Sequence, residues 1–305
     1  MKVFKISVIL FALTCGFSTN MLAQSKAVST KRPNIVVIIS DDHAYQAIGA
    51  YGSKLMPTPN IDRIANEGVL FNNGYVTNSI CGPSRAVFLT GKYSHKNGFK
   101  DNENSRFDGS QDSFVKQLKN SGYQTAWIGK WHLETQPQGF DFWQILPGQG
   151  QYYNPDFHMM DGSKKQKEGY VSDVIEDVSE NWLSNRDPNK PFCLVIGHKA
   201  THRTWIPDAQ DMGKYDHITF PLPHNFYDNY TNREAAKVQD MTISKTMQMG
   251  YDLKMFGTEN EANKEGTIMR MNPEQRQKFD AYYGAVNADL KSKNLSGKEL
   301  IEWKY

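Results

Sequence analysis

The sequence is poor in cysteine, in clustered charge and in long apolar runs. Its 305 residues include only three cysteines, Cys15, Cys81 and Cys193, too few for the disulfide framework of a small secreted domain. The formal net charge is +2 and no basic block occurs, so no nucleic-acid partner is expected. Beyond the N-terminal residues no run is apolar enough to span a bilayer, so stable membrane insertion is not expected either. The length suffices for one large domain or two small ones with a buried core.

The N-terminus has the composition of a secretory signal peptide. Two lysines precede an apolar stretch over residues 6–17, which small and polar residues follow. This order predicts a signal peptide over residues 1–23, with cleavage after Ala23. The residues before Cys15 match a lipoprotein box poorly. The protein is therefore expected to be exported to the periplasm or secreted, without a lipid anchor.

From Asn34 onward, short apolar runs alternate with helical patterns. NIVVIIS is a continuous β-branched run, which predicts a strand buried on both faces. In TPNIDRIANEG, Thr58 is the expected N-cap, Pro59 the first helical residue and Gly68 the stop. Further strands are expected in QTAWIG and FCLVIG, and further helices in QDSFVKQLKNSGY and SDVIEDVSENWLSNR. This alternation predicts an α/β domain with a mostly parallel central sheet flanked by helices.

Each of the three predicted strands runs into chemically active side chains. The strand ends are followed by Asp41-Asp42-His43, by Lys130-Trp131-His132 and by His198-Lys199-Ala200-Thr201-His202. Any one of these groups alone is more often a turn or ordinary surface. The carboxyl ends of parallel strands lie at one edge of a sheet, however, so we expect the three groups to meet. Paired carboxylates attract a hard divalent cation, and lysine and imidazolium nearby would hold sulfate or phosphate.

The stretch NSICGPSRAVFLTGK places Cys81 just before a predicted helix. Pro83 favours a first helical turn, and the helix is expected to continue to Gly91. Cys81 would then lie at a helix N-terminus, where free backbone amides favour negative charge. Arg85, one turn further, can support a nucleophile or an anion. Cys193 lies inside FCLVIG and is interpreted as a buried free cysteine. On these residues alone, a purely structural Cys81 stays open.

The residues Cys81-Gly82-Pro83-Ser84-Arg85, followed after four residues by Thr90-Gly91, resemble the type I sulfatase signature C-x-P-S-R-x-x-x-x-T-G. The resemblance extends over residues 31–305. It implies the alkaline-phosphatase-like N-terminal domain of a sulfatase, in which the cysteine is oxidised to formylglycine (3-oxoalanine) by a formylglycine-generating or equivalent enzyme. In that family the hydrated aldehyde attacks the sulfate ester.

Three segments are similar to carbohydrate-acting sulfatases, particularly bacterial N-acetylglucosamine-6-sulfatases. They are DDHAYQAIGAYG, TPNIDRIANEG and PGQGQYYNPDF. The resemblance implies a sulfated carbohydrate substrate of the glycosaminoglycan or mucin type, with N-acetylglucosamine 6-sulfate as the named candidate. This substrate is a family analogy and not a deduction from the residues.

The same resemblance implies roles around the nucleophile. Asp41 and Asp42 match the family's first two metal ligands, and an oxygen derived from Cys81 would be another. The implied ion is Ca²⁺, with Mg²⁺ as the alternative. Arg85 matches the residue that steadies the formylglycine.

It also implies roles for residues that bind the sulfate. Lys130 matches the sulfate-binding lysine, and His132 matches the histidine that contacts the diol. His202 matches the histidine that binds sulfate and helps protonate the leaving alcohol, although Thr201 replaces the proline usual before it. Arg203, beside His202, is a candidate to pair with an anionic sugar. The catalytic set is therefore expected to be Cys81, Arg85, Lys130, His132 and His202.

Part of the family pattern has no counterpart after His202. Its remaining metal ligands are an Asp followed by Asn or Gln after an apolar strand, with a further lysine downstream. Neither these nor the smaller C-terminal domain is found, and KELIEWKY reads as the middle of a helix. Calcium usually takes six to eight oxygens, more than Asp41, Asp42 and a formylglycine oxygen supply. We therefore expect a catalytic domain incomplete at its C-terminus, and inactive or nearly so alone.

Two other functions stay open. The charged site and a metal would also suit a phosphate or phosphonate ester hydrolase of the same fold, although the signature favours sulfate. Alternatively, the chain is a non-catalytic remnant that binds sulfated glycan through Lys130, His132, His202 and Arg203. Paired assays on aryl sulfate and aryl phosphate would separate the two enzymes. Glycan binding that survives Cys81→Ala without turnover would indicate the remnant.

Overall fold

The computed structural model describes residues 32–256 and 266–305. Its central sheet has six strands in the order β1-β6-β2-β3-β4-β5. The strands are β1 (Ile35–Ile39), β2 (Gln124–Lys130), β3 (Phe142–Leu146), β4 (Asp156–Met159), β5 (Lys164–Gln166) and β6 (Phe192–Gly197). β1, β6, β2 and β3 run parallel; β4 pairs antiparallel with β3, and β5 pairs antiparallel with β4. The predicted mostly parallel sheet is confirmed. The predicted signal peptide and Cys15 lie outside the described residues.

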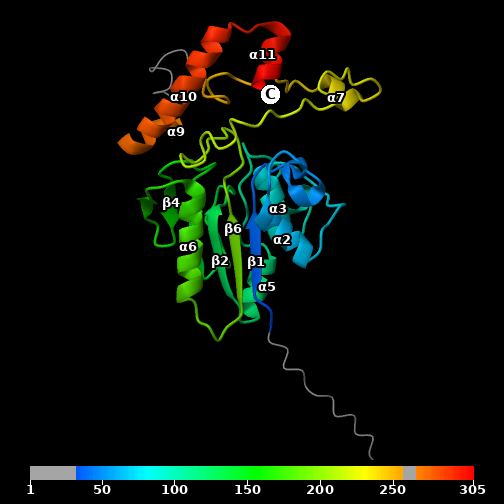
Figure 1. Cartoon of the computed structure of the whole chain (residues 1–305). Helices are drawn as coiled ribbons and strands as arrows, with labels where there is room; N and C mark the ends of the chain where they lie inside the picture. The colour runs from blue at the N-terminus through cyan, green and yellow to red at the C-terminus, as the bar shows by residue number, and fades with distance from the viewer. Residues whose placement is uncertain (1–31, 257–265) are drawn as a thin grey trace, which may run out of the picture. The chain divides into compact units, whose positions relative to one another are not determined.

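Helices pack on both faces of the sheet (Figure 1). The helices before β6 are α2 (Pro59–Glu67), α3 (Cys81–Thr90), α4 (Ser94–Asn97), α5 (Phe114–Asn120) and α6 (Val171–Asn185), with 3₁₀ turns η1 (Tyr45–Ala47) and η2 (Gly49–Tyr51). Successive side chains of β2 point to opposite faces. Ile128 joins the core beneath α6, whereas Trp127 joins the core with α3 and α5. The sheet is therefore covered on both sides at its centre, as expected from the buried runs of β2 and β6.

The signals for the ends of α2 are borne out, but Thr58 acts differently from a simple cap. The helix begins at Pro59 and is followed by Gly68. The Thr58 hydroxyl makes no cap hydrogen bond to this helix. It accepts from the backbone N of Gly49 at 2.8 Å and donates to Asp62 at 2.8 Å. The side chain thus ties η2 to α2.

The chain after β6 is mostly turns and helices. It contains α7 (Glu234–Val238), α9 (Gly266–Met269), α10 (Pro273–Lys293) and α11 (Gly297–Lys304). α10 starts with a capping box between Asn272 and Gln275, and its Phe279 is buried in the core beneath α6. Within the described ranges no strand follows β6. Nor is any described helix both long enough and apolar enough to cross a membrane.

The prediction that β1 is buried on both faces is wrong. Val36 is 50% exposed and Ile38 is 58% exposed, whereas Ile35, Val37 and Ile39 pack against the core. β1 is the edge strand and pairs with β6 alone in the part of the chain that the structure describes. A continuous apolar run predicts a fully buried strand only if other elements cover both faces of that strand. No described element covers the face of β1 that carries Val36 and Ile38.

The exposed face of β1 predicts self-association. Replacing Val36 and Ile38 together with threonine keeps β-branched side chains and removes exposed apolar area, which is an aggregation hazard on an edge strand. We expect less association in sedimentation or light scattering, with a stability within about 0.5 kcal/mol of the parent. The control is Val37→Thr, which puts a hydroxyl into the core and should destabilise the fold. Unchanged association of the double variant would contradict this prediction.

Candidate active site

The ends of β1 and β6 are fastened together by backbone hydrogen bonds. The backbone N of Asp41 donates to the carbonyl of Ala200 at 3.0 Å, and the backbone N of Thr201 donates to the carbonyl of Asp41 at 2.8 Å. Asp42 and His132, which follow β1 and β2, both have φ of 54°. Asp and His are among the residues that tolerate this left-handed region. These turns bring the strand-end side chains to one edge of the sheet.

Asp41 is the buried carboxylate of the site. It is 6% exposed, and Lys130, which is fully buried, donates from Nζ to its Oδ2. Arg85 Nη2 lies 3.6 Å from its Oδ1. Burial alone would raise the pKa of Asp41, but Lys130 and Arg85 outweigh it and hold the pKa below its ordinary value. Asp41 is therefore ionised at neutral pH.

Cys81 is the first residue of α3, as the sequence predicted. Gly82 allows this helix to start close to the end of β2. A Cβ at Gly82 would lie 2.5 Å from a Phe99 ring carbon and 2.9 Å from the carbonyl oxygen of His132. Burial raises the pKa of the Cys81 thiol, with Lys130 opposing the effect. As a plain thiol, Cys81 is therefore protonated and a weak nucleophile at neutral pH.

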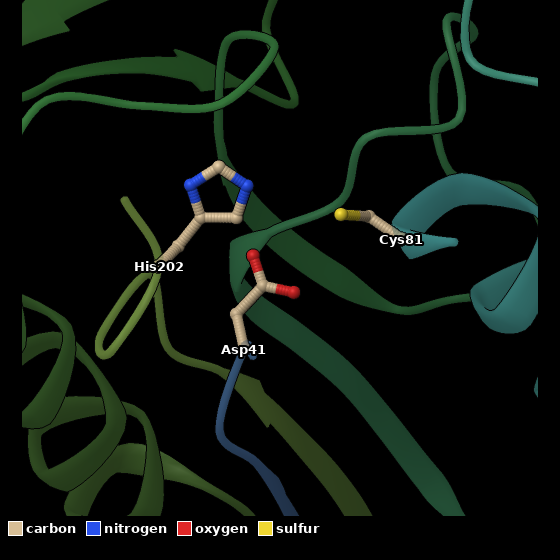
Figure 2. A group of neighbouring side chains, drawn as sticks. All are labelled: Asp41, Cys81 and His202. Atoms are coloured by element: carbon tan, nitrogen blue, oxygen red, sulfur yellow. The ribbon is translucent and has the colours of Figure 1, made fainter. Parts of the chain in front are cut away.

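Asp41, Cys81 and His202 converge from three parts of the sequence (Figure 2). One ligand atom from each residue lies within 4.8 Å of the others. His202 Nε2 also lies 3.5 Å from Oδ2 of Asp42, whose side chain is 57% exposed. The strand-end argument therefore predicted correctly that these groups meet. The roles assigned to them remain predictions.

Two buried nitrogens at the site have no hydrogen-bond partner among the described residues. They are Arg85 Nη2 and His132 Nδ1. Arg85 Nη1, in contrast, donates to the carbonyl of Lys130 at 2.7 Å. A buried polar atom left unpaired costs about 1–3 kcal/mol, so such atoms need an explanation in a native structure.

Comparison with known proteins identifies the family. The profile of the family described as Sulfatase matches residues 33–289. The chain belongs to the sulfatase family. It is 47% identical over 293 residues to an N-acetylglucosamine-6-O-sulfatase of Bacteroides thetaiotaomicron, covering 93% of this chain and 52% of that protein. It is 31% identical over 240 residues to an ulvan-active sulfatase of Formosa agariphila, covering 77% of this chain and 40% of that protein.

A solved structure gives the same result for the fold. It shows a protein in complex with its substrate, D-glucosamine-2-N,6-O-disulfate, and it superposes on this sulfatase with a TM-score of 0.86 at 48% identity. The match covers 90% of this chain and 57% of the other. The predicted alkaline-phosphatase-like sulfatase fold is confirmed. The chain spans about half the length of the Bacteroides relative.

Sulfatases generally use a formylglycine and a divalent cation, and the residues present fit part of a metal site. Asp41 is ionised, Asp42 follows it directly, and carboxylate oxygens are the ligands that hard cations prefer. Cys81 and His202 lie beside Asp41. The described residues supply fewer oxygens than Ca²⁺ usually takes. The two aspartates of this sulfatase are therefore suited to be part of a larger ligand set.

Sequence reasoning missed two residues of the site, Gln149 and Lys199. The side-chain oxygen of Gln149 accepts from Lys130 Nζ, and its backbone oxygen accepts from Lys199 Nζ at 3.2 Å. Burial and the neighbouring Lys130 lower the pKa of Lys199 to about 8. Lys199 belongs to the group His198–His202 that follows the third predicted strand, but the sequence assigned it no role. Gln149 lies in the loop after β3, where no local pattern indicates a contact with Lys130.

Arg203 was predicted to bind substrate, and the structure shows it paired within the chain. Its guanidinium donates to both carboxylate oxygens of Asp252, at 2.5 and 2.8 Å, and lies 5.0 Å from the ring centroid of Tyr251. The side chain remains partly exposed. Binding an anionic sugar would therefore have to compete with Asp252 or use the exposed edge of the guanidinium.

His132 predicts a pH-dependent stability. Burial, with Lys130 and Arg85 nearby, lowers its pKa from 6.5 to about 4. Between these two values the unfolded chain binds the proton and the folded chain does not. The free energy of unfolding therefore falls as the pH falls from about 6.5 to about 4, by up to roughly 3 kcal/mol.

Replacing His132 with glutamine removes this titration, so the loss of stability between pH 6.5 and 4 should be smaller than in the parent. Urea unfolding at a series of pH values measures it. The control is His95→Gln, which removes an exposed imidazole stacked on Tyr93 and leaves His132 in place. Equal slopes for the parent and the His132 variant would show that His132 is not the titrating group.

Proposed function

We propose that this protein hydrolyses sulfate esters of a sulfated carbohydrate, with N-acetylglucosamine 6-sulfate as the candidate substrate. The observation that carries the proposal is the meeting of Cys81, at a helix N-terminus, with the buried pair of Asp41 and Lys130. The names of the Bacteroides relative and of the ligand in the solved complex support a 6-sulfated glucosamine.

The residues of the chain would divide the chemistry between them. A formylglycine at position 81 supplies an oxygen nucleophile in place of the thiol. Arg85 and Lys130 place positive charge where the sulfate oxygens gain negative charge. His132 is neutral because its pKa is about 4, so it can accept a proton at the nucleophile. His202 would donate a proton to the leaving alcohol.

The finer assignments belong to the same proposal. Asp41 and Asp42 would hold Ca²⁺, which polarises a sulfate oxygen as a Lewis acid when bound. A formylglycine-generating or equivalent enzyme would modify Cys81, and the signature around Cys81 supports that partner. Export to the periplasm or outside the cell is supported by the composition of residues 1–23.

The test is sulfate release by the chain produced together with a formylglycine-generating enzyme. Mass spectrometry first establishes conversion of Cys81. The converted protein is then assayed with calcium on N-acetylglucosamine 6-sulfate and, in parallel, on the matching 6-phosphate. Because the described residues supply only part of a metal site, we expect at most slow sulfate release by the chain alone, reduced further by a chelator, and little phosphate release. Faster phosphate release would favour the phosphate ester hydrolase. Binding of the sulfated sugar that survives Cys81→Ala, with no turnover before or after the substitution, would favour the glycan-binding remnant.

A further inference from the structure

Lys199 is a buried cation that lacks an anion. It is 4% exposed, its Nζ donates to the backbone oxygen of Gln149 at 3.2 Å, and it lies 4.7 Å from the ring centroid of Tyr152. Among the described residues no carboxylate lies within ion-pair distance of this ammonium. A buried lysine is rarely left without a charged partner, because removing the ammonium from water is costly.

The position of Lys199 is fixed by the backbone around it. The backbone N of His198 donates to the carbonyl of Ile39 at 2.9 Å, and that of His202 donates to the carbonyl of Lys199 at 3.0 Å. Tyr152, whose ring Lys199 contacts, donates its hydroxyl hydrogen to the carbonyl of His202. The ammonium is thus held at the end of β6, on the same loop as His202.

Gln149 holds Lys199 beside Lys130. Its side-chain oxygen accepts from Lys130 and its backbone oxygen accepts from Lys199, so one residue contacts both ammonium groups. Lys130 also donates to Asp41. The charge of Lys130 disfavours the charged form of Lys199, so the two ammonium groups repel each other, and an anion between them would make this arrangement favourable.

The site as a whole carries more buried positive than negative charge. Arg85, Lys130 and Lys199 are all buried at this edge, and Asp41 is the buried carboxylate that faces them. Asp42 is more than half exposed and balances less of the charge. A bound sulfate group would bring negative charge to this edge of the sheet.

We propose that Lys199 is a further substrate-binding residue, whose ammonium holds oxygens of the reacting sulfate group together with that of Lys130. This inference rests on the function proposed above. The sulfate group carries its charge before and during the reaction, so Lys199 would contribute mainly to binding. Its loss should therefore raise KM more than it lowers kcat.

The decisive variant is Lys199→Met, because binding and structural roles predict opposite effects on stability. Methionine fills a similar volume and removes an unpaired buried charge, so the fold should be as stable as the parent or more stable. If Lys199 served only the structure, its replacement would lower stability. The matched controls are Lys199→Arg, which keeps the charge, and Lys165→Gln, which changes an exposed lysine on β5.

The experiment titrates inorganic sulfate into the full chain with calcium present and measures affinity by calorimetry and by the shift in melting temperature. We expect Lys199→Met to bind sulfate about ten- to a hundredfold more weakly, with stability kept. Lys199→Arg should retain part of the affinity and Lys165→Gln all of it. KM and kcat for the 6-sulfated sugar are measured on the same variants.

Each outcome decides one claim. Parent-like sulfate affinity in Lys199→Met, or a loss of stability in that variant, overturns the role of Lys199 and leaves the proposed function in place. If the converted parent neither binds sulfate nor releases it from the sugar, the proposed function fails, and the inference about Lys199 fails with it.

Discussion

Replacing Asp41 with asparagine should lower the free energy of unfolding by about 3–5 kcal/mol, the usual result of removing one partner of a buried ion pair. The variant keeps the shape of the side chain and removes its charge. Lys130 and Arg85, both buried against this carboxylate, would then face each other without an anion. Denaturant unfolding of the unmodified chain measures the effect, so the result does not depend on activity.

Asp42 is the matched control, because it is the next residue and differs chiefly in exposure. Its side chain is 57% exposed, with Oδ2 3.5 Å from His202 Nε2, so Asp42→Asn should change stability by less than about 1 kcal/mol. Both variants remove one carboxylate and should weaken calcium binding if both residues are ligands. Equal losses of stability in the two variants would show that Asp41 does not hold the buried cations together.

Replacing Cys81 with alanine should lower sulfate release to the background rate, because alanine leaves no oxygen nucleophile at position 81 to form the covalent intermediate. The parent in this comparison is the chain with Cys81 converted to formylglycine and calcium supplied. Turnover is followed by the appearance of free sulfate. Binding of inorganic sulfate to the variant is measured in parallel, since Lys130 and Lys199 are unchanged.

The second cysteine provides the control. Cys193 is buried in β6, where burial raises its pKa to about 11. Cys193→Ala should cost stability, by about 1–2 kcal/mol, through the cavity it leaves, and should leave turnover per folded molecule unchanged. Substantial sulfate release by the Cys81 variant would remove Cys81 from the mechanism.

The elements that the sequence predicted well are those with local signals. FCLVIG forms β6 over the predicted residues, and Gly91 follows the helix that starts at Cys81. In both, a continuous apolar run or a Pro and Gly at the helix ends decides the structure within a few residues. The strands β3, β4 and β5 were not predicted. The residues of β5, Lys164–Gln166, are all exposed and carry no alternation of polar and apolar side chains.

The contacts of the candidate site can likewise be separated into those that the sequence predicted and those that it did not. Parallel strands place their carboxyl ends at one edge, so the meeting of Asp41, Lys130 and His202 followed from the expected topology. The contact of Gln149 with Lys130 depends on the path of a loop, which no spacing rule gives. The exposure of Val36 depends on β1 being an edge strand, and that is a property of the assembled sheet, not of the run itself.

The backbone hydrogen bonds between Asp41 and residues 200–201 couple local opening of the sheet at β1 to the geometry of the candidate active site. Segments with few buried apolar contacts and exposed backbone hydrogen bonds open most readily in native-state fluctuations, and among the described residues β1 is an edge strand that leads directly to Asp41. When β1 frays, the carboxylate leaves Lys130 and the loop that bears His202 loses its backbone partner at the same moment. Hydrogen exchange at the backbone amides of Asp41 and Thr201 should therefore occur in one concerted opening event. Any contact that stabilises the outer edge of β1 would also keep Asp41 and the His202 loop in place.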